Sequence, residues 1–235
     1  VSHDLRNPLS VIRASMEMAR LKDDTTPLAR GERAVDRIDQ LVTELLTLAR
    51  QGSGIDEPTE FTLDGVVRDA WGTAGSPDAT LLVAADARVR GDRGRLRQAF
   101  ENLFRNCIEH GTPDDPTART DLTVVVAATE AGFLVADDGP GVDPDHHERV
   151  FEPGVTTRED GTGYGLDIVR EIVESHGWEV TLRDDAVDIG GLAIEDTGVD
   201  GEHAPNADGE IDGACFEVHA PDPETAAEAD LWIGQ

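Results

Sequence analysis

The sequence predicts an α+β protein in which an antiparallel helical hairpin precedes a two-layer α/β sandwich with a mixed sheet. Residues 1–52 contain two apolar stripes whose spacing alternates between four and three positions, as in paired helices. Strand-like and helix-like segments then follow in an irregular order, which is typical of a mixed sheet with helices on one face. A chain of 235 residues has room for one large domain and a small module.

The two apolar stripes predict the helices of the hairpin. The first consists of Leu5, Leu9, Ile12, Met16 and Ala19, and the second of Val35, Ile38, Val42, Leu45 and Ala49. Residues 23–27, which are acidic and end in proline, separate the two stripes. A hairpin this short buries little surface alone, so we expect a homodimer whose hairpins form a four-helix bundle. The alternative is a hairpin that packs onto the next domain.

Residues 53–58 read as a linker, and the predicted sandwich extends over residues 59–221. We expect helices over 61–71, 93–110 and 166–176, and strands over 80–84, 122–128, 133–136, 180–182 and 215–218. Residues 184–213 are acidic and poorly patterned, which predicts a mobile insertion, and a strand over 192–194 stays an open question. Residues 222–235 form a predicted C-terminal tail.

The formal net charge is −29, and Lys22 is the single lysine of the chain. This charge makes binding to a nucleic acid backbone unfavourable. Its even spread along the sequence indicates a solvated acidic surface adapted to a salty cytosol. No apolar run approaches the length of a membrane span, and no signal peptide pattern is present. Because Val1 already lies in a helical pattern, we expect the sequence to be a fragment that lacks an N-terminal part.

Two glycine-containing motifs predict a phosphate site. Residues 137–141 read Asp-Asp-Gly-Pro-Gly, and residues 161–166 read Gly-Thr-Gly-Tyr-Gly-Leu and lead into a helical pattern. Glycines at alternate positions let the backbone approach a ligand closely, and the start of a helix offers free N–H groups to an anion. A plain glycine-rich loop is the alternative.

A third motif, His-Asp-Leu-Arg-Asn-Pro-Leu, occupies residues 3–9. On a helix His3 and Asn7 lie one turn apart, whereas Asp4 points about 100° away. A neutral imidazole can attack phosphorus, and a nearby carboxylate can hold its tautomer and take up the proton. The alternative is an ordinary surface histidine.

The predicted helix over 93–110 carries Asn102 and Asn106 one turn apart on one face. An amide oxygen is a good ligand for Mg²⁺ that also touches nucleotide phosphates. Asparagine is a poor helix former, so two asparagines on the same helix face indicate a functional role. Cys107 lies on the apolar side of this helix and is expected to pack in the core.

Taken in order, these motifs resemble those of the sensor histidine kinases of two-component systems. Residues 3–9 resemble the phospho-acceptor motif, with Asp4 where glutamate is commoner, and residues 91–98 and 102–106 resemble the asparagine helix. Residues 137–141, 149–153 and 161–166 are similar to the first glycine motif, the phenylalanine box and the second glycine motif. The resemblance covers residues 1–183 and implies a GHKL-type ATP-binding domain after the hairpin.

The resemblance implies a role for each matching residue of the hairpin. His3 is implied to be the phosphorylated nucleophile, and Asp4 the neighbour that assists phosphoryl transfer. Asn7 matches a position that places water during dephosphorylation of the partner. That partner is implied to be the receiver domain of a response regulator, which accepts the phosphoryl group on an aspartate.

In the second domain the resemblance implies an ATP site. Asn106 is implied to coordinate Mg²⁺, with Asn102 near the phosphates and Asp137 hydrogen-bonded to the adenine amino group. Residues 143–160 are implied to form a lid over ATP. The remaining implied nucleotide-binding residues are Gly139, Gly141, Phe151, Gly161, Thr162, Gly163, Gly165 and Leu166. The resemblance also implies a cytoplasmic location, with a membrane reached only through a preceding part of the protein.

Two other functions are alternatives to the kinase. Glu109 and Thr156 depart from the family pattern, which has a lysine and an arginine there, and this favours a catalytically degenerate dimeric scaffold that binds ATP. The other rival is an ATP hydrolase of the gyrase or Hsp90 type. Such hydrolases place a glutamate one turn before the metal-binding asparagine, whereas that position here is Asn102 and Glu101 points elsewhere.

Overall fold

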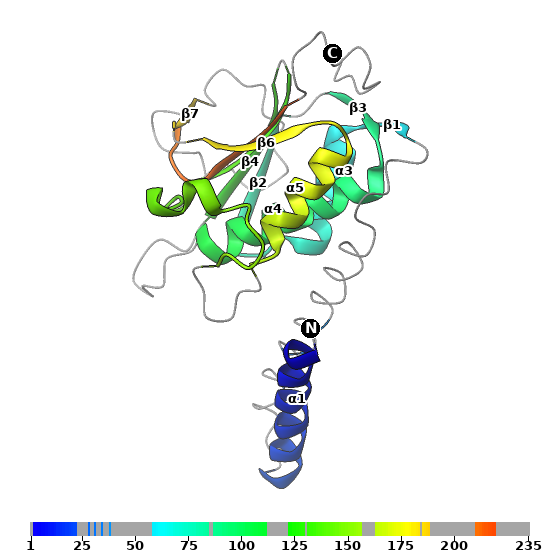
Figure 1. The fold of residues 1–235 in the computed structure, drawn as a ribbon, viewed down its shortest axis with the longest axis vertical. Coiled ribbons are helices and arrows are strands. Elements are labelled where there is room, and N and C mark those ends of the chain that lie inside the picture. Colours follow the sequence, from blue (N-terminus) through cyan, green and yellow to red (C-terminus); the bar gives the residue numbers. More distant parts are fainter. Residues whose placement is uncertain are drawn as a thin grey trace. The chain divides into compact units, whose positions relative to one another are not determined.

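The computed structural model describes residues 2–22, 28, 31, 34, 38, 58–84, 87–111, 122–129, 131–156, 163–183, 185–188 and 210–219. The chain divides into two compact units, Val1–Gln51 and Gly52–Gln235, each described here by itself (Figure 1). Most of the second predicted apolar stripe, the possible strand over 192–194 and the tail over 222–235 lie outside the described residues. Within the described residues, no helix combines the length and apolar character that crossing a membrane requires.

The smaller unit contains α1 (Ser2–Lys22), and residues 28, 31, 34 and 38 are also helical. Ser15 of α1 is buried, and a Cβ added to Gly31 would lie 3.4 Å from the Ser15 Cβ. The two helical segments therefore approach each other through small residues. Leu9 and Met16, which belong to the predicted apolar stripe, are 52% and 57% exposed. The stripe is thus exposed at these two residues in a single chain, whereas Ile12 and Ala19 are partly buried.

The larger unit is built on a five-stranded sheet in the order β2-β4-β5-β9-β6. The strands are β2 (Ala79–Ala84), β4 (Leu122–Ala128), β5 (Gly132–Asp137), β9 (Cys215–His219) and β6 (Glu179–Arg183). β2 and β4 are parallel, and the other neighbours are antiparallel. The mixed sheet is confirmed. β5 is buried along its whole length, because both faces of the sheet are covered there.

Three helices cover one face of this sheet: α3 (Leu63–Ala74), α4 (Arg93–Gly111) and α5 (Gly165–Ser175) (Figure 1). The main core lies between these helices and the sheet, and aromatic rings fill its centre. The Phe100 ring of α4 lies 5.0 Å from that of Phe133 in β5, and Phe104 meets Trp71 of α3 edge-on at 5.1 Å. These contacts fix α4 against the sheet, with its asparagine face available to the site.

The opposite face of the sheet carries a second apolar cluster that includes Leu82, Val125 and Leu134. Val187 and Ile211 pack into it from β7 (Val187–Asp188) and β8 (Glu210–Ile211), which pair antiparallel. The predicted insertion over 184–213 therefore begins and ends in ordered strand residues, contrary to the expectation of a mobile segment throughout. Strands of two residues are too short to produce a readable alternation.

The chain also forms two strands that the sequence reading missed, β1 (Thr59–Thr62) and β3 (Arg88–Gly91), which pair antiparallel. The helix expected over 61–71 begins instead at Leu63. Thr62 ends the strand in an extended conformation, and its Oγ1 accepts a hydrogen bond from the Gly65 N–H at 3.3 Å. This helix cap sets the boundary that hydrophobic periodicity alone placed too early.

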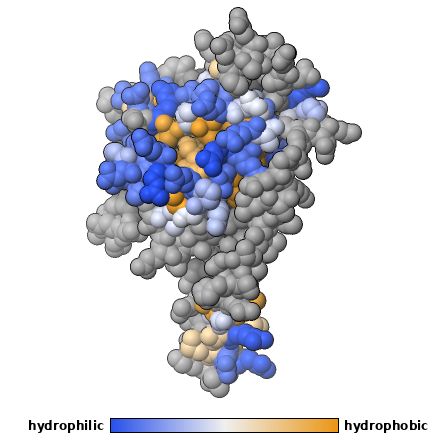
Figure 2. Space-filling view, viewed as in Figure 1, coloured by the Kyte–Doolittle hydropathy of each residue, from blue (hydrophilic) through white to orange (hydrophobic). Residues whose placement is uncertain are grey.

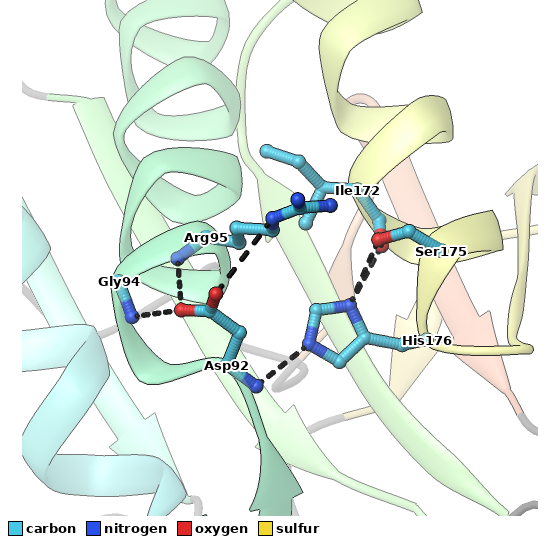
Figure 3. A network of polar contacts seen from close by, with 6 residues as sticks. All are labelled: Asp92, Gly94, Arg95, Ile172, Ser175 and His176. Atoms are coloured by element: carbon cyan, nitrogen blue, oxygen red, sulfur yellow. Dashed lines mark hydrogen bonds and ion pairs between the residues drawn. The ribbon is translucent and has the colours of Figure 1, made fainter. Parts of the chain in front are cut away.

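A buried histidine joins the end of α5 to the start of α4 (Figure 3). His176 Nδ1 donates to the Ile172 carbonyl at 2.7 Å, and Nε2 accepts from the Asp92 N–H at 3.1 Å. Asp92 Oδ1 in turn accepts from the N–H groups of Gly94 and Arg95 in the first turn of α4. Burial lowers the pKa of His176, which keeps the ring neutral and able to accept. These hydrogen bonds of His176, which we call the His176 clamp, fix α5 against α4.

Candidate functional site

Asp137 is the last residue of β5, and its side chain is 2% exposed. Its Oδ1 accepts from the N–H groups of Gly139 at 2.9 Å and Ala214 at 3.4 Å. Burial raises the pKa of Asp137 to about 6, although the Gly139 hydrogen bond opposes the shift. Cys107 of α4 lies beside this carboxylate, and burial raises the thiol pKa well above its usual value, so the thiol stays protonated. A buried carboxylate of this kind can accept a hydrogen bond from an amino group.

Glycines let three backbone segments converge on Asp137. A Cβ added to Gly139 would lie 2.5 Å from the Cα of Gly111, where α4 ends. One added to Gly213 would overlap the Asp137 carbonyl oxygen and lie 2.6 Å from Asp137 Oδ1. Gly141 has a φ of 74°, which favours glycine. The sequence reading named Gly139 and Gly141 but missed Gly213 and Ala214, which lie 76 and 77 positions after Asp137 along the chain.

Asn102 and Asn106 of α4 both face the first residue of α5. A Cβ added to Gly165 would lie 3.6 Å from Asn106 Oδ1 and 3.8 Å from Asn102 Oδ1. Asn102 is 5% exposed, and its Nδ2 donates to the Gln98 carbonyl at 2.9 Å. The Asn106 Nδ2 is buried and has no hydrogen-bond partner among the described residues. The structure thus brings the predicted asparagine pair and the second glycine motif together.

The start of α5 has features that suit an anion. Tyr164 occupies the N-cap position and makes no side-chain cap hydrogen bond, so it satisfies none of the first N–H groups of the helix. Helix starts of this kind bind phosphate groups through their N–H groups and positive dipole end. The amide oxygens of Asn102 and Asn106 lie next to this end, and such oxygens suit a hard cation that accompanies phosphate. The neighbouring Leu166 is partly buried against the main core.

Gly154, within the predicted lid over 143–160, contacts Gly163 of the second glycine motif. Gly154 donates its N–H to the Gly163 carbonyl at 2.9 Å, and a Cβ on Gly163 would lie 2.5 Å from the Gly154 carbonyl carbon. Both glycines have positive φ, 81° and 72°. Within the lid, η1 (Pro144–Arg149) forms a short 3-10 helix, and Phe151 packs edge-on against Phe216 at 6.2 Å. Gly161 and Thr162 lie outside the described residues.

The surface of the larger unit shows where apolar side chains reach solvent. In Figure 2, which has the same viewpoint as Figure 1, apolar residues lie in the middle of this unit and hydrophilic residues ring them. Val142, Phe151 and Leu166, which lie in or next to the predicted motifs, are partly buried and pack against the main core.

The predicted phospho-acceptor residues belong to the other unit. His3, Asp4 and Asn7 lie within α1, so His3 and Asn7 are one helical turn apart as expected. Their side chains lie outside what the structure describes. The geometry of the nucleotide-type site and the position of the histidine motif are therefore two separate observations.

Comparison with known families covers both units. Residues 91–224 match the family described as histidine kinase-, DNA gyrase B-, and HSP90-like ATPase, and residues 1–54 match the His Kinase A (phospho-acceptor) domain. The chain belongs to the sensor histidine kinases. Its larger unit is thus an ATP-binding domain of this family, and its smaller unit a phospho-acceptor domain. The fold, a helical unit followed by a two-layer α/β domain with a mixed sheet, agrees with this membership.

Curated relatives agree with this membership, and a solved structure shares the fold. The methanogenesis regulatory histidine kinase FilI of Methanothrix harundinacea is 32% identical over 197 residues, which cover 78% of this chain and 22% of FilI. Sensor histidine kinase ZraS of Salmonella typhi is 32% identical over 206 residues, covering 78% of this chain and 41% of ZraS. Histidine kinase ThkA, solved in complex with response regulator protein TrrA, has a TM-score of 0.58 and 20% identity, covering 95% of this chain and 60% of that one. The chain spans well under half the length of both curated relatives.

Proposed function

We propose that this chain is the core of an ATP-dependent protein-histidine kinase that phosphorylates itself on His3. The proposal is carried by one observation: a phospho-acceptor domain and an ATP-binding domain occur in the same chain. Asp137 is assigned to accept a hydrogen bond from the adenine amino group, and its buried carboxylate supports this assignment. The phosphates lie against the start of α5 and the two asparagine amides.

His3 acts as the nucleophile in this proposal. Its neutral ring nitrogen attacks the terminal phosphorus of ATP in line, the new N–P bond forms, and the bond to the ADP oxygen breaks. Asp4 holds the imidazole tautomer and takes up the ring proton. The position of both residues in the first two turns of α1 supports a shared role.

Mg²⁺ fits the amide oxygen of Asn106, which is proposed to hold it. The Asn106 Oδ1 faces the start of α5, and its Nδ2 is buried without a hydrogen-bond partner in the described part of the chain. Mg²⁺ is often held by one or two protein oxygens together with the phosphates of the substrate. When bound, it neutralises charge on the phosphates. No group of three histidine, cysteine or acidic residues that could hold a metal occurs among the described residues.

The position of Glu101 helps to distinguish a kinase from an ATP hydrolase. Its Oε1 lies 3.3 Å from Arg97 Nη1, in an ion pair on α4. The residue that faces Gly165 one turn before Asn106 is Asn102, which is neutral and cannot deprotonate water. This arrangement favours transfer to His3 over hydrolysis of ATP. The presence of His3, Asn106 and the ordered glycines favours a kinase over a degenerate scaffold.

The partners proposed are a second copy of the chain and a response regulator. Leu9 and Met16 expose more than half of their area on α1, and a homodimer would cover this apolar stripe in a four-helix bundle. The phosphoryl group then passes from His3 to an aspartate of the regulator's receiver domain, and Asn7 places water for its later removal. The ThkA structure, a fold neighbour, contains the response regulator protein TrrA.

The composition supports a working environment of high salt, such as the cytoplasm of a haloarchaeon. With a formal net charge of −29, self-repulsion is strong at low ionic strength and is screened when the Debye length falls to a few ångströms. We place the kinase core in the cytoplasm, where ATP and response regulators occur. The same charge disfavours nucleic acid as a partner.

Incubation with γ-labelled ATP and Mg²⁺ in molar KCl tests the kinase proposal. We expect label that is labile in acid, stable in alkali and absent from His3→Gln. His3→Gln is expected to keep ATP affinity, because the nucleotide site lies in the other unit. Labelling should be stronger in molar KCl than at ~0.15 M. Steady release of phosphate without protein label would instead identify a hydrolase, and ATP binding with neither outcome would identify a scaffold.

A further inference from the structure

Arg105 lies beside Asn102 on α4, at the edge of the face that carries the two asparagines. Residues three and four positions apart are neighbours on a helix, so Arg105 adjoins Asn102 and precedes Glu109 by one turn. The Arg105 side chain is half-buried, and its Nη1 donates to Asn102 Oδ1 at 3.2 Å. This oxygen is the atom 3.8 Å from a Cβ added to Gly165. Asn102 therefore connects the guanidinium to the start of α5, because its Oδ1 accepts from Arg105 and also faces Gly165.

The partner of Arg105 differs from those of three other arginines in the larger unit, Arg68, Arg97 and Arg170, which pair with carboxylates. Arg68 Nε lies 2.6 Å from Asp64, Arg97 Nη1 lies 3.3 Å from Glu101, and Arg170 Nη2 lies 2.8 Å from Asp167. Arg105 meets the neutral amide of Asn102 instead, and no described carboxylate forms an ion pair with it. In a chain with 49 acidic and 20 basic residues, such a cation is available to an anion from outside.

The charges around the start of α5 leave a place for this cation. Asn102 and Asn106, the side chains nearest Gly165, are both neutral. Glu109, one turn beyond Arg105, adds a negative charge where the family resemblance leads one to expect a lysine. Asp167 in the first turn of α5 is negative, and Arg170 already pairs with it. A positive side chain here would stabilise bound phosphates, and the described contact of Arg105 holds it beside Asn102.

We propose that Arg105 binds a phosphate group of ATP and supplies the positive charge that Glu109 does not. The inference rests on the proposed nucleotide site and adds a residue to it. Asn102 holds the guanidinium in place before the nucleotide arrives, which lowers the entropy lost on binding. The planar guanidinium presents several N–H donors in a geometry that matches phosphate oxygens. Its contribution depends on the phosphates and is absent for a ligand without them.

Calorimetry on the full chain tests this inference by comparing ATP with adenosine, at fixed salt and with Mg²⁺. Arg105→Gln is expected to raise the Kd for ATP at least about tenfold, since a hydrogen bond to a charged group is lost. The Kd for adenosine should stay within about twofold. Arg97→Gln is the matched control: it removes an arginine of the same helix that already pairs with Glu101, and it should leave both affinities within about twofold.

A rescue variant separates binding of phosphate from support of Asn102. Glu109→Lys placed in Arg105→Gln restores a cation one turn along the same face, and we expect most of the lost ATP affinity to return. Arg105→Met keeps the apolar stem and serves if Arg105→Gln does not fold. Equal weakening of ATP and adenosine without rescue, or an unchanged ATP affinity in both neutral variants, would overturn the inference.

Labelling of His3 is measured on the same variants, so that the two proposals can fail separately. ATP binding that depends on Arg105, in a wild-type chain that does not label His3, leaves this inference standing and contradicts the kinase. If His3 is labelled and ATP binding does not depend on Arg105, the kinase proposal stands and this inference is contradicted. A wild-type chain that binds no ATP contradicts both.

Discussion

Among single residues, Asp137 combines deep burial with hydrogen bonds from two backbone N–H groups. Its pKa of about 6, against 3.8 for an ordinary aspartate, means that the folded chain holds the carboxyl proton more tightly than the unfolded chain does. The resulting stabilisation is present below pH 3.8 and is lost as the pH rises through about 6. At neutral pH the ionised group therefore costs about 3 kcal/mol of folding free energy. We infer that the charge is retained at this cost because it serves binding of the proposed ligand.

Asp137→Asn removes that charge and retains the shape. We expect the free energy of unfolding at pH 7.5 to rise by up to about 3 kcal/mol, and its decline between pH 4 and 7 to become shallower. The affinity for ATP should fall at least about tenfold, because a charged acceptor is lost. Urea unfolding at several pH values and calorimetry measure the two effects. Asp78→Asn, at an exposed position before β2, should change neither. Unaltered ATP affinity in Asp137→Asn would remove the assigned contact.

At the scale of elements, the site depends on how closely its turns approach each other. The His176 clamp fixes α5 against α4, and Gly165 then meets the two asparagines. The turn before β9 closes the other end, where Gly213 packs on Asp137. Because the Gly213 approach is to backbone atoms of Asp137 and Gly139, a methyl group added there has no flexible neighbour to displace.

Gly213→Ala tests the closure of the turn before β9. Its Cβ would overlap the Asp137 carbonyl oxygen, so we expect a loss of about 1–3 kcal/mol in stability and a large fall in ATP affinity. Gly72→Ala is the matched control, because a Cβ at this exposed position in α3 has nothing within 4 Å. It should stabilise the chain by up to about 1 kcal/mol and leave ATP binding unchanged. ATP affinity at the wild-type level in Gly213→Ala would show that this turn is not part of the site.

At the scale of the whole molecule, association of two chains decides what covers α1. The buried face of α1 at Ser15 meets Gly31 within the same chain, whereas Leu9 and Met16 remain exposed. Exposed apolar residues seven positions apart form one stripe on a helix, which is the pattern of a helix bundle seam. This surface is therefore available to a second copy.

Met16→Glu places a charge on the exposed stripe. We expect the variant to be monomeric at concentrations where the wild-type chain is dimeric, because the dimer would bury an unpaired carboxylate. Light scattering after size exclusion measures the mass. Ala14→Glu adds the same charge at an exposed position about 140° around the helix from Leu9, and should stay dimeric. A dimeric Met16→Glu, or a monomeric wild type, would contradict the proposed bundle.

Long periodic segments were predicted well from the sequence. The strand predicted over 122–128 coincides with β4. The helices predicted over 93–110 and 166–176 and the strand over 133–136 differ from α4, α5 and β5 by at most one residue at each end. Their apolar repeats are long enough to distinguish a helix from a strand. The strands β1, β3, β7 and β8 have two or four residues, and pairing with distant partners rather than periodicity decides them.

The sequence alone determined the order of the motifs, the alternation of helix and strand, and the residue types of the site, because these depend on local spacing. Only the tertiary structure decided that Gly213 closes on Asp137, that His176 fixes α5 against α4, and that Arg105 meets an amide instead of a carboxylate. Most of these contacts join residues that are far apart in the chain, and they form through packing and the pairing of polar groups. Burial and the choice among competing partners are properties of the folded chain, so no local pattern encodes them.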